Sequence, residues 1–475
     1  MSNSSLARQR INSLLDDNSF VEIGASVTAR ATDFNLKPAE ALTDGVVTGY
    51  GVIDGRPVYV YSQDASVLGG SVGEMHAKKI AHLYNLAMKT GAPVIGLLDS
   101  TGLRLQESTD ALAAFGKIYR KMTQASGVIP QITAVFGGCG GGLAVLTGLS
   151  DFTFMEEKKG KLFVNSPNAL AGNYTEKLDT AGAKFQSEES GLADFVCEEA
   201  EIYDQMRSLI TLLPSNNEDE VLAECTDDLN RSVANLSAFG GDIALAIAQI
   251  ADDNEFVEVK SAYAKNMVTG FIRLNGATVG VVGNRSEILD ENGKAKEKFE
   301  TLLKPDGCKK AISFISFCDA FEIPIVSFTN VTGYSACIEC EKKIARAVAG
   351  LTFAFASATV PKVNVVVGKA FGSAAIAMNS GAIGADVTLA WENAEIGTMN
   401  AKDAAAILFD GEKADVINEK AAEYAALQNS AKSAAARGYV DQIIDADETR
   451  KYVIGALEML YSKSVAVANK KHGTV

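Results

Sequence analysis

An internal repeat is the feature that most constrains how this chain can fold. Residues 16–22 (DDNSFVE) recur as residues 252–258 (DDNEFVE). Further matched residues follow in the same order along both halves: Lys78 and Lys79 with Lys309 and Lys310, Pro93 with Pro324, Asp99 with Asn330, Gly102 with Gly333, Ser126 with Ser357, Pro130 with Pro361, Gly137 with Gly368, and Gly141 with Gly372. So many anchors in one order indicate two copies of a single domain.

Each copy has the pattern of an α/β domain. Alternating segments around an Asp-Gly or Asn-Gly pair predict a β-hairpin. A helical stretch follows, and two apolar runs after it are typical of buried parallel strands. The predicted segments are the hairpins 49–63 and 270–284, the helices 77–90 and 308–321, and the strands 93–100, 130–138, 324–331 and 361–369. Repeated strand–helix–strand units predict an α/β core.

An acidic segment separates the two copies. Residues 214–228 (PSNNEDEVLAECTDD) combine carboxylates with few large apolar side chains, which is typical of a linker. We therefore expect an N-terminal domain over residues 1–225 and a C-terminal domain over residues 229–475.

Composition narrows the possible functions. The hydrophobic fraction is 47% and the charged fraction 22%, so the chain can bury a substantial core. The net charge of −15 argues against a nucleic-acid partner, although it leaves room for a local basic pocket. Three histidines in 475 residues make His-cluster chemistry an unlikely basis for activity, whereas 42 glycines favour sites made of backbone.

Cysteine usage and the N-terminus bear on the compartment. The seven scattered cysteines fit a reducing cytosol, and the first twenty residues lack the apolar core of a signal peptide. No uninterrupted apolar run reaches the length of a membrane span. We expect a cytoplasmic protein without a metal site. The pair Cys337 and Cys340 has the spacing of a redox motif or half a zinc site, and we interpret it as incidental because no second pair accompanies it.

Two glycine-rich turns are the strongest candidates for chemistry. Residues 137–142 (GGCGGG) follow a predicted strand and precede an apolar helix, and residues 368–375 (GKAFGSAA) occupy the same place in the second copy. Glycines at a strand-to-helix turn let backbone N–H groups approach a ligand where the helix favours negative charge. Such a turn could hold a phosphate or the oxygen of an enolate, or serve only for close packing.

At these motifs the sequence resembles the carboxyltransferase subunits of biotin-dependent acyl-CoA carboxylases. This group includes the propionyl-CoA carboxylase β-chain, transcarboxylase and the α-type subunit of methylmalonyl-CoA decarboxylase. The resembling segments include DGVVTGYGVIDGRPVYV, LLDSTGLRLQES, SGVIPQITAVFGGCGGG and ATVPKVNVVVGKAFGSAAIAMNS. The resemblance implies an α/β fold of tandem crotonase-like (ClpP/crotonase) ββα-superhelix domains, with acyl-CoA on the N-terminal half and biotin on the C-terminal half.

The resemblance also implies a function. It is transfer of a carboxyl group between carboxybiotin on a separate carrier protein and a short-chain acyl-CoA of acetyl, propionyl or methylmalonyl type. Two backbone oxyanion holes would serve it, with Gly141 and Gly142 at the thioester and Ser373 and Ala374 at the biotin. The implied substrate-binding residues are Gly102, Arg104, Gly140, Gly333, Tyr334, Gly372 and Ile376. Implied partners are the biotin carrier, a biotin carboxylase or membrane decarboxylase subunit, and further copies of this chain, from a dimer to a hexamer.

Departures from the family pattern keep other readings open. Asn330 stands where the family commonly has aspartate, and Ser373 replaces a glycine. The alternatives are a subunit of a sodium-pumping acyl-CoA decarboxylase, a crotonase-type hydratase or hydrolase with Glu107 as its carboxylate, and a diverged non-catalytic subunit. Lys89, in a sequence like a biotin-attachment site, is interpreted as a lysine at a helix end.

Individual residues also have two interpretations each. Arg104 could anchor a phosphate or carboxylate, or form an interface salt bridge. Ile376 could line an acyl pocket or belong to the core. His76 could lie at the edge of an active site or pack at the start of a helix. The lysine pairs are read as solvated faces, although a CoA phosphate needs some such group: Lys78 and Lys79, Lys309 and Lys310, and Lys342 and Lys343.

Overall fold

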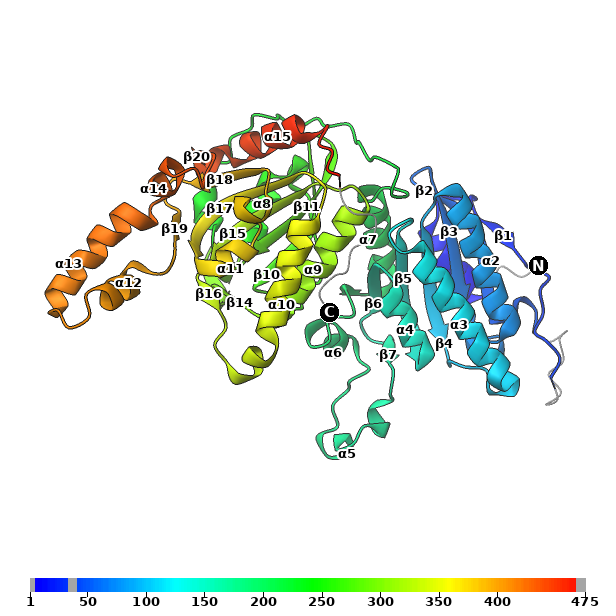
Figure 1. The fold of residues 1–475 in the computed structure, drawn as a ribbon. Helices are drawn as coiled ribbons and strands as arrows, with labels where there is room; N and C mark the ends of the chain where they lie inside the picture. The colour runs from blue at the N-terminus through cyan, green and yellow to red at the C-terminus, as the bar shows by residue number, and fades with distance from the viewer. Residues whose placement is uncertain (1–4, 33–40, 467–475) are drawn as a thin grey trace. The chain divides into compact units, whose positions relative to one another are not determined.

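The computed structural model describes residues 5–32 and 41–466, which form two compact units, Met1–Glu220 and Val221–Val475 (Figure 1). Each unit contains an eight-stranded sheet with helices packed against it. The α/β class and the parallel central strands agree with the sequence prediction.

The first unit is built from seven helices and eight strands among its described residues. Its elements are α1 (Leu6–Leu14), β1 (Val21–Ile23), β2 (Val46–Ile53), β3 (Arg56–Gln63), α2 (Glu74–Thr90), β4 (Val94–Ser100), α3 (Ser108–Ala125), β5 (Gln131–Gly140), α4 (Gly142–Leu149), β6 (Phe152–Glu156), β7 (Lys161–Phe163), α5 (Asn173–Glu176), α6 (Ala183–Glu188), β8 (Phe195–Cys197) and α7 (Glu199–Leu212).

The second unit repeats this order and adds further elements. Its elements are α8 (Ile243–Ile250), β9 (Phe256–Glu258), β10 (Met267–Leu274), β11 (Ala277–Asn284), β12 (Glu287–Leu289), β13 (Ala295–Lys298), β14 (Leu302–Leu303), α9 (Pro305–Ala320), β15 (Ile325–Val331), β16 (Gly333–Tyr334), α10 (Ile338–Ser357), β17 (Lys362–Phe371), α11 (Gly372–Ala377), β18 (Val387–Trp391), β19 (Glu395–Gly397), α12 (Ala401–Leu408), α13 (Ala414–Tyr424), α14 (Ala431–Ala436), β20 (Gln442–Ile444) and α15 (Thr449–Leu460).

The two sheets have the same strand order. The first runs β1-β2-β3-β4-β5-β6-β8, and the second runs β9-β10-β11-β15-β17-β18-β20. The one strand off each path, β7 or β19, pairs with the corresponding central strand, β5 or β17. The first three strands of each sheet pair antiparallel and the others pair parallel. The sequence repeat therefore corresponds to a repeat of topology.

The hairpin turns explain why their dipeptides recur. Asp54 and Gly55 have φ of 48° and 76°, and Asn275 and Gly276 have φ of 53° and 77°. A two-residue hairpin of this kind needs two left-handed residues in succession, which Asp-Gly and Asn-Gly tolerate best. Each turn thus fixes the register of its strand pair, Ile53 with Arg56 and Leu274 with Ala277.

The apolar faces of the sheets are covered by helices. In the first unit α2 and α3 lie side by side, and in the second α9 and α10 do the same (Figure 1). Residues of β4, β5, α2 and α3 share one buried cluster that includes Leu98, Val135, Ile80 and Ile118. Because these strands are buried on both faces, their sequences are continuous apolar runs rather than alternating ones.

An arginine from the last helix holds the hairpin turn of each unit. In the first unit Arg207 donates to the carbonyl of Leu14 at 2.9 Å and to Asp16 at 2.7 Å, and Asp16 accepts the N–H groups of Asp54 and Gly55. The arginine and the aspartate are about one quarter exposed.

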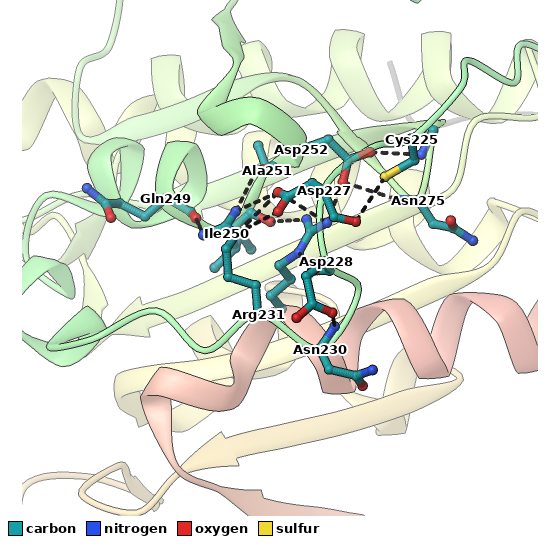
Figure 2. Close-up of polar contacts among 12 residues, drawn as sticks. Cys225, Asp227, Asp228, Asn230, Arg231, Gln249, Ile250, Ala251, Asp252 and Asn275 are labelled. Carbon is teal, nitrogen blue, oxygen red and sulfur yellow. Dashed lines mark hydrogen bonds and ion pairs between the residues drawn. The ribbon is translucent and has the colours of Figure 1, made fainter.

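The second unit has the same arrangement, but there it is buried. Arg450 donates to the carbonyl of Ile250 at 2.7 Å and to Asp252 at 2.6 Å, and its side chain is 0% exposed. The segment that carries Asp227 and Asp228 covers this arginine: Arg450 donates to the carbonyl of Asp228 at 3.1 Å and lies 3.4 Å from the carboxylate of Asp227. Figure 2 shows that Asp227 also accepts from Arg231, at 2.9 Å. Residues 221–228, the second part of the expected linker, are therefore part of the polar structure of the second unit.

The described helices are too short or too polar to cross a membrane. None of them has an apolar stretch with the length and hydropathy that a bilayer crossing requires.

Candidate functional site: two uncapped helix starts

The first glycine turn presents backbone donors at the start of α4. Gly141 has φ of 61°, a conformation that favours glycine, and space lies open where its Cβ would be. No side chain caps α4. The N–H of Gly141 itself donates to the carbonyl of Phe163 at 2.9 Å, so the first donor without that engagement is Gly142. In the predicted pair, Gly141 thus provides the left-handed backbone conformation, and Gly142 provides the N–H donor.

The second turn has the same backbone form. Gly372 has φ of 62°, and no side chain caps α11, whose second residue is Ser373. A Cβ on Gly372 would meet the carbonyl oxygen of Thr398 at 3.2 Å. The Ser373 hydroxyl accepts from the Tyr334 hydroxyl at 2.8 Å, so the serine side chain is held aside by a neighbour.

An uncapped helix start can stabilise an oxyanion. The N–H groups of a first helical turn have no acceptor within the helix, and the helix dipole adds partial positive charge there. Fixed N–H donors stabilise a negative oxygen without any titrating side chain. Both turns therefore offer chemistry suited to a thioester or ureido oxygen.

Tyrosines support both helix starts. Tyr119 on α3 donates its hydroxyl to the carbonyl of Gly142 at 2.6 Å. Tyr334 in the second unit donates its hydroxyl to the side chain of Ser373. Tyr119 could not be identified from the sequence, because nothing in the periodicity of α3 distinguishes this tyrosine from an ordinary core residue. Its place one helical turn after Phe115, which also faces Gly142, is visible only in the fold.

The loops after β4 and β15 lie beside these turns. Ser100 pairs with Cys139, and a Cβ on Gly102 would lie 3.6 Å from the carbonyl of Gly140. In the second unit Val331 pairs with Ala370. The structure thus brings the predicted residues Gly102 and Gly140 together, and likewise Tyr334 and Ser373.

The replacement of aspartate by Asn330 is compensated nearby. In the first unit Asp99 is paired with Arg10 at 2.9 Å and leaves no room for a side chain on Gly137. In the second unit Asn330 covers Gly368 in the same way, and its amide oxygen accepts the N–H of Lys369 at 3.0 Å.

The repeat places Ala246 opposite Arg10, and this alanine is buried. A carboxylate with its arginine has therefore become an amide with an alanine. Because both members of the pair changed together, Asn330 preserves the local packing rather than leaving a defect.

Arg104 does not face an open site. Its side chain is 1% exposed, and it donates to Glu107 at 3.0 Å, to the carbonyl of Ser71 at 2.5 Å and to the carboxylate of Asp44. Contrary to the prediction of a substrate-binding arginine, this guanidinium is turned inward, because two buried carboxylates need a cation between them.

Glu107 is likewise committed to the interior. It is buried, accepts from Arg104, and its other oxygen accepts the N–H of Glu74 at 2.6 Å at the start of α2. A carboxylate held by a guanidinium and a helix N-terminus is a poor general base. This geometry argues against the hydratase or hydrolase alternative, which depends on Glu107.

His76 packs at the start of α2. It is 0% exposed, its N–H donates to Asp44 at 2.7 Å, and its Nδ1 lies 3.0 Å from the carbonyl of Asp44. Burial, together with the charge of Arg104, lowers the pKa of this imidazole to about 3. The histidine is therefore neutral and structural, the second of its two interpretations.

Two lysines expected on solvated faces are buried. Lys79 donates to the carbonyl of Thr43 at 3.1 Å, and burial lowers its pKa to about 8. Lys310 donates to the carbonyls of Lys260 and Tyr263 at 2.7 and 3.0 Å. The second lysine of each pair thus satisfies loop carbonyls in both units, which explains why the repeat keeps it.

The remaining candidates lie as follows. Ile376 is 42% exposed, so it is not core and stays available to a ligand. Lys89 is exposed in the last turn of α2, before the left-handed cap Gly91, as expected for a lysine at a helix end. Cys337 and Cys340 form a disulfide at the start of α10, so reading their spacing as incidental was wrong.

Comparison with known proteins places this geometry in context. The family profile described as carboxyl transferase domain matches residues 2–475. A methylmalonyl-CoA decarboxylase subunit alpha from Veillonella parvula is 40% identical, over 99% of this chain and 92% of the relative. A propionyl-CoA carboxylase beta chain from Roseobacter denitrificans is 38% identical, over 99% and 93%.

Solved structures agree. The crystal structure of transcarboxylase 12S, a hexamer with methylmalonyl-CoA and methylmalonic acid bound, matches with a TM-score of 0.91 at 36% identity. The match covers 98% of this chain and 92% of that one.

Proposed function

This chain belongs to the carboxyl transferase family, and on that premise we propose that it is the carboxyltransferase subunit of a biotin-dependent acyl-CoA enzyme. It moves a carboxyl group between biotin on a separate carrier protein and a short-chain acyl-CoA. The observation that carries the proposal is the pair of uncapped helix starts, each with a left-handed glycine: Gly141 directly precedes α4, and Gly372 is the first residue of α11.

The two units divide the work in this proposal. The first unit, Met1–Glu220, binds the acyl-CoA, and the N–H of Gly142 stabilises the thioester oxygen as negative charge develops on it. Gly102 and Gly140 line this side because their backbones lie together without side chains. Removing one such donor typically slows a reaction by about 10²–10³.

The second unit, Val221–Val475, receives biotin. Neutral N–H donors at Ser373 and Ala374 suit a neutral ureido oxygen that gains charge during transfer, and Ile376 offers apolar contact beside them. Biotin supplies or accepts the carboxyl group; the residues of this chain orient it and stabilise charge. Tyr334 positions Ser373 through the hydroxyl contact.

Each unit in this proposal is a crotonase-like ββα superhelix. Support comes from the identical strand order of the two sheets and from the match to the transcarboxylase structure. The chain would act in the cytoplasm as a homo-oligomer, between a dimer and a hexamer, with a biotin carrier and a biotin carboxylase as partners.

A second candidate reverses the direction of transfer. Relatives named methylmalonyl-CoA decarboxylase subunit alpha, from Veillonella parvula and Propionigenium modestum, are 40% and 37% identical. In that case the partner is a membrane decarboxylase subunit, and the same two helix starts serve removal of the carboxyl group from the acyl-CoA.

Isotope exchange tests the proposal. The purified chain is mixed with biotin carrier and with methylmalonyl-CoA labelled in its free carboxyl group, and transfer of label to the carrier is followed. Propionyl- and acetyl-CoA are compared as acceptors of the carboxyl group, and a glutaconyl-type ester is compared with methylmalonyl-CoA as a donor. We expect exchange that requires the carrier or free biotin. Conversion of an acyl-CoA without any biotin would contradict the proposal and favour a hydratase or hydrolase.

A further inference from the structure

The disulfide between Cys337 and Cys340 lies beside the second helix start. Cys337 is the residue before α10, is exposed, and its Sγ accepts the N–H of Cys340 at 3.0 Å. Cys340 is half-buried one turn into the helix and accepts from the Ser335 hydroxyl at 3.3 Å. The Sγ of Cys337 is therefore accessible to small molecules, whereas the Sγ of Cys340 is held by a hydrogen bond from the protein.

Four contacts join this disulfide to Ser373. Ser335, which contacts Cys340, is buried, and its N–H donates to the carbonyl of Leu303 at 3.0 Å. The preceding residue, Tyr334, pairs with Leu303 and donates its hydroxyl to Ser373. A short, hydrogen-bonded segment thus runs from the sulfur atoms to the proposed biotin-side donors.

The corresponding segment of the first unit is held without cysteine. There the repeat places Leu103 and Arg104 opposite Tyr334 and Ser335, and the buried ion pairs of Arg104 with Asp44 and Glu107 fix the turn. The second unit has a covalent link at the place where the first has permanent charges. A disulfide, unlike a buried ion pair, can be opened and closed by exchange.

We propose that Cys337 and Cys340 form a thiol–disulfide exchange site that takes small disulfides of the glutathione type and sets the activity of the biotin-side helix start. This rests on the proposed function for its effect on activity, though not for the exchange chemistry. The closed pair holds Tyr334 against Ser373; the open pair releases the turn and slows carboxyl transfer.

The small disulfide is the oxidant that accepts the two electrons released when the two cysteines pair. In the reduced protein the thiolate of Cys337, stabilised at the helix N-terminus, attacks one sulfur of the small disulfide and releases one thiolate. Cys340, after losing its proton, attacks the Sγ of Cys337, and the second small thiolate leaves. Two electrons pass from the protein to the small disulfide, and the two cysteine protons end on the two small thiols.

A metal site does not account for the pair. Among residues 5–32 and 41–466, no group of three or more His, Cys, Asp or Glu side chains could hold a metal ion. Two sulfur atoms alone are half of a structural zinc site.

Redox titration of the full chain tests the exchange site. The protein is equilibrated at stepped ratios of reduced to oxidised glutathione, and alkylation of Cys337 and Cys340 is read by mass spectrometry. We expect the two residues to become protected together as the oxidised fraction rises. C340S should accumulate one glutathione on Cys337, whereas C225S, which changes a half-exposed cysteine elsewhere, should behave as wild type. Persistent alkylation at every ratio would overturn the site.

Label exchange with the biotin carrier tests the coupling. We expect wild type to transfer label about fivefold more slowly when reduced, the effect of losing about one hydrogen bond. C337S and Y334F should show the slow rate in both states, and C225S the full response. Equal rates for oxidised and reduced wild type would overturn the coupling. If no form exchanges label, the proposed function fails, and the alkylation result still decides the exchange site.

Discussion

The turn after β4 and the turn after β15 occupy equivalent places in the two sheets but are held in different ways. In the first unit the buried guanidinium of Arg104 lies between Asp44 and Glu107. In the second unit a tyrosine hydroxyl and a disulfide hold the same segment near the surface. The first arrangement is permanent, and the second can respond to its surroundings. The duplicated fold therefore has one fixed side and one adjustable side.

The arginines that hold the two hairpin turns differ in the opposite sense: Arg450 in the second unit is fully buried, whereas Arg207 in the first unit is partly exposed. This difference in burial gives the largest expected effect on stability. R450M removes a fully buried arginine and leaves Asp252 without its cation, which should destabilise the second unit by about 3–5 kcal/mol. R207M makes the matched change in the partly exposed clamp and should cost the first unit about 1 kcal/mol or less. Hydrogen exchange resolved by unit measures both. Equal losses would contradict the assigned difference in burial.

The next difference between the units is a buried histidine: the first unit has His76 where the repeat places Gly307 in the second. The pKa of His76 is lowered to about 3 by burial, so below pH 6.5 the unfolded chain binds a proton that the folded first unit excludes. Stability due to this residue is present above pH 6.5 and falls by about 1.4 kcal/mol per pH unit as the pH drops toward 3.

The measurement compares wild type with H76Q between pH 7 and pH 5. Asp151, whose pKa burial raises to about 7, changes the stability of the first unit in the opposite direction, but it is common to both proteins. The stability of H76Q relative to wild type should therefore increase as the pH falls. A difference independent of pH would show that His76 titrates normally.

The two supporting tyrosines should give the smallest effect. Y119F removes the hydroxyl that donates to the carbonyl of Gly142, and Y334F removes the one that donates to Ser373. Each loss of one hydrogen bond should slow label exchange about fivefold. Only Y334F should change the response to glutathione. If Y119F also altered the response of label exchange to glutathione, the distinction between a fixed first unit and an adjustable second unit would be wrong.

The elements that depend on local sequence pattern could be predicted from the sequence. The Asp-Gly and Asn-Gly turns, the helices α2 and α9, and the central strands are where periodicity and turn chemistry predict them. The glycine turns at Gly141 and Gly372 were also found, because left-handed backbone requires a residue type that can be read directly.

Long-range polar partners were beyond sequence reasoning. Arg104 was expected to face a ligand, but Asp44, sixty positions earlier in the chain, turns it inward. The Gly141 N–H was expected to be a donor to substrate, but a strand contact with Phe163 uses it. The spacing of Cys337 and Cys340 was visible, yet whether they meet depends on the turn before α10. Each of these depends on where a distant segment arrives.

Proline scanning of both helix starts tests the central claim most directly, that the backbone N–H donors at these two helix starts carry the reaction. Proline at a first helical turn keeps the helix and removes only the N–H. G142A and S373A are the matched controls, because they keep the N–H and place the same Cβ. Label exchange between methylmalonyl-CoA and the biotin carrier is measured for all four variants.

The account predicts that G142P and S373P each lose about 10²–10³ in rate, while G142A and S373A stay within about tenfold of wild type. G142A carries some cost, because its Cβ would lie 2.9 Å from the Tyr119 hydroxyl. Full exchange by either proline variant, with its helix intact by hydrogen exchange, would contradict the claim for that unit.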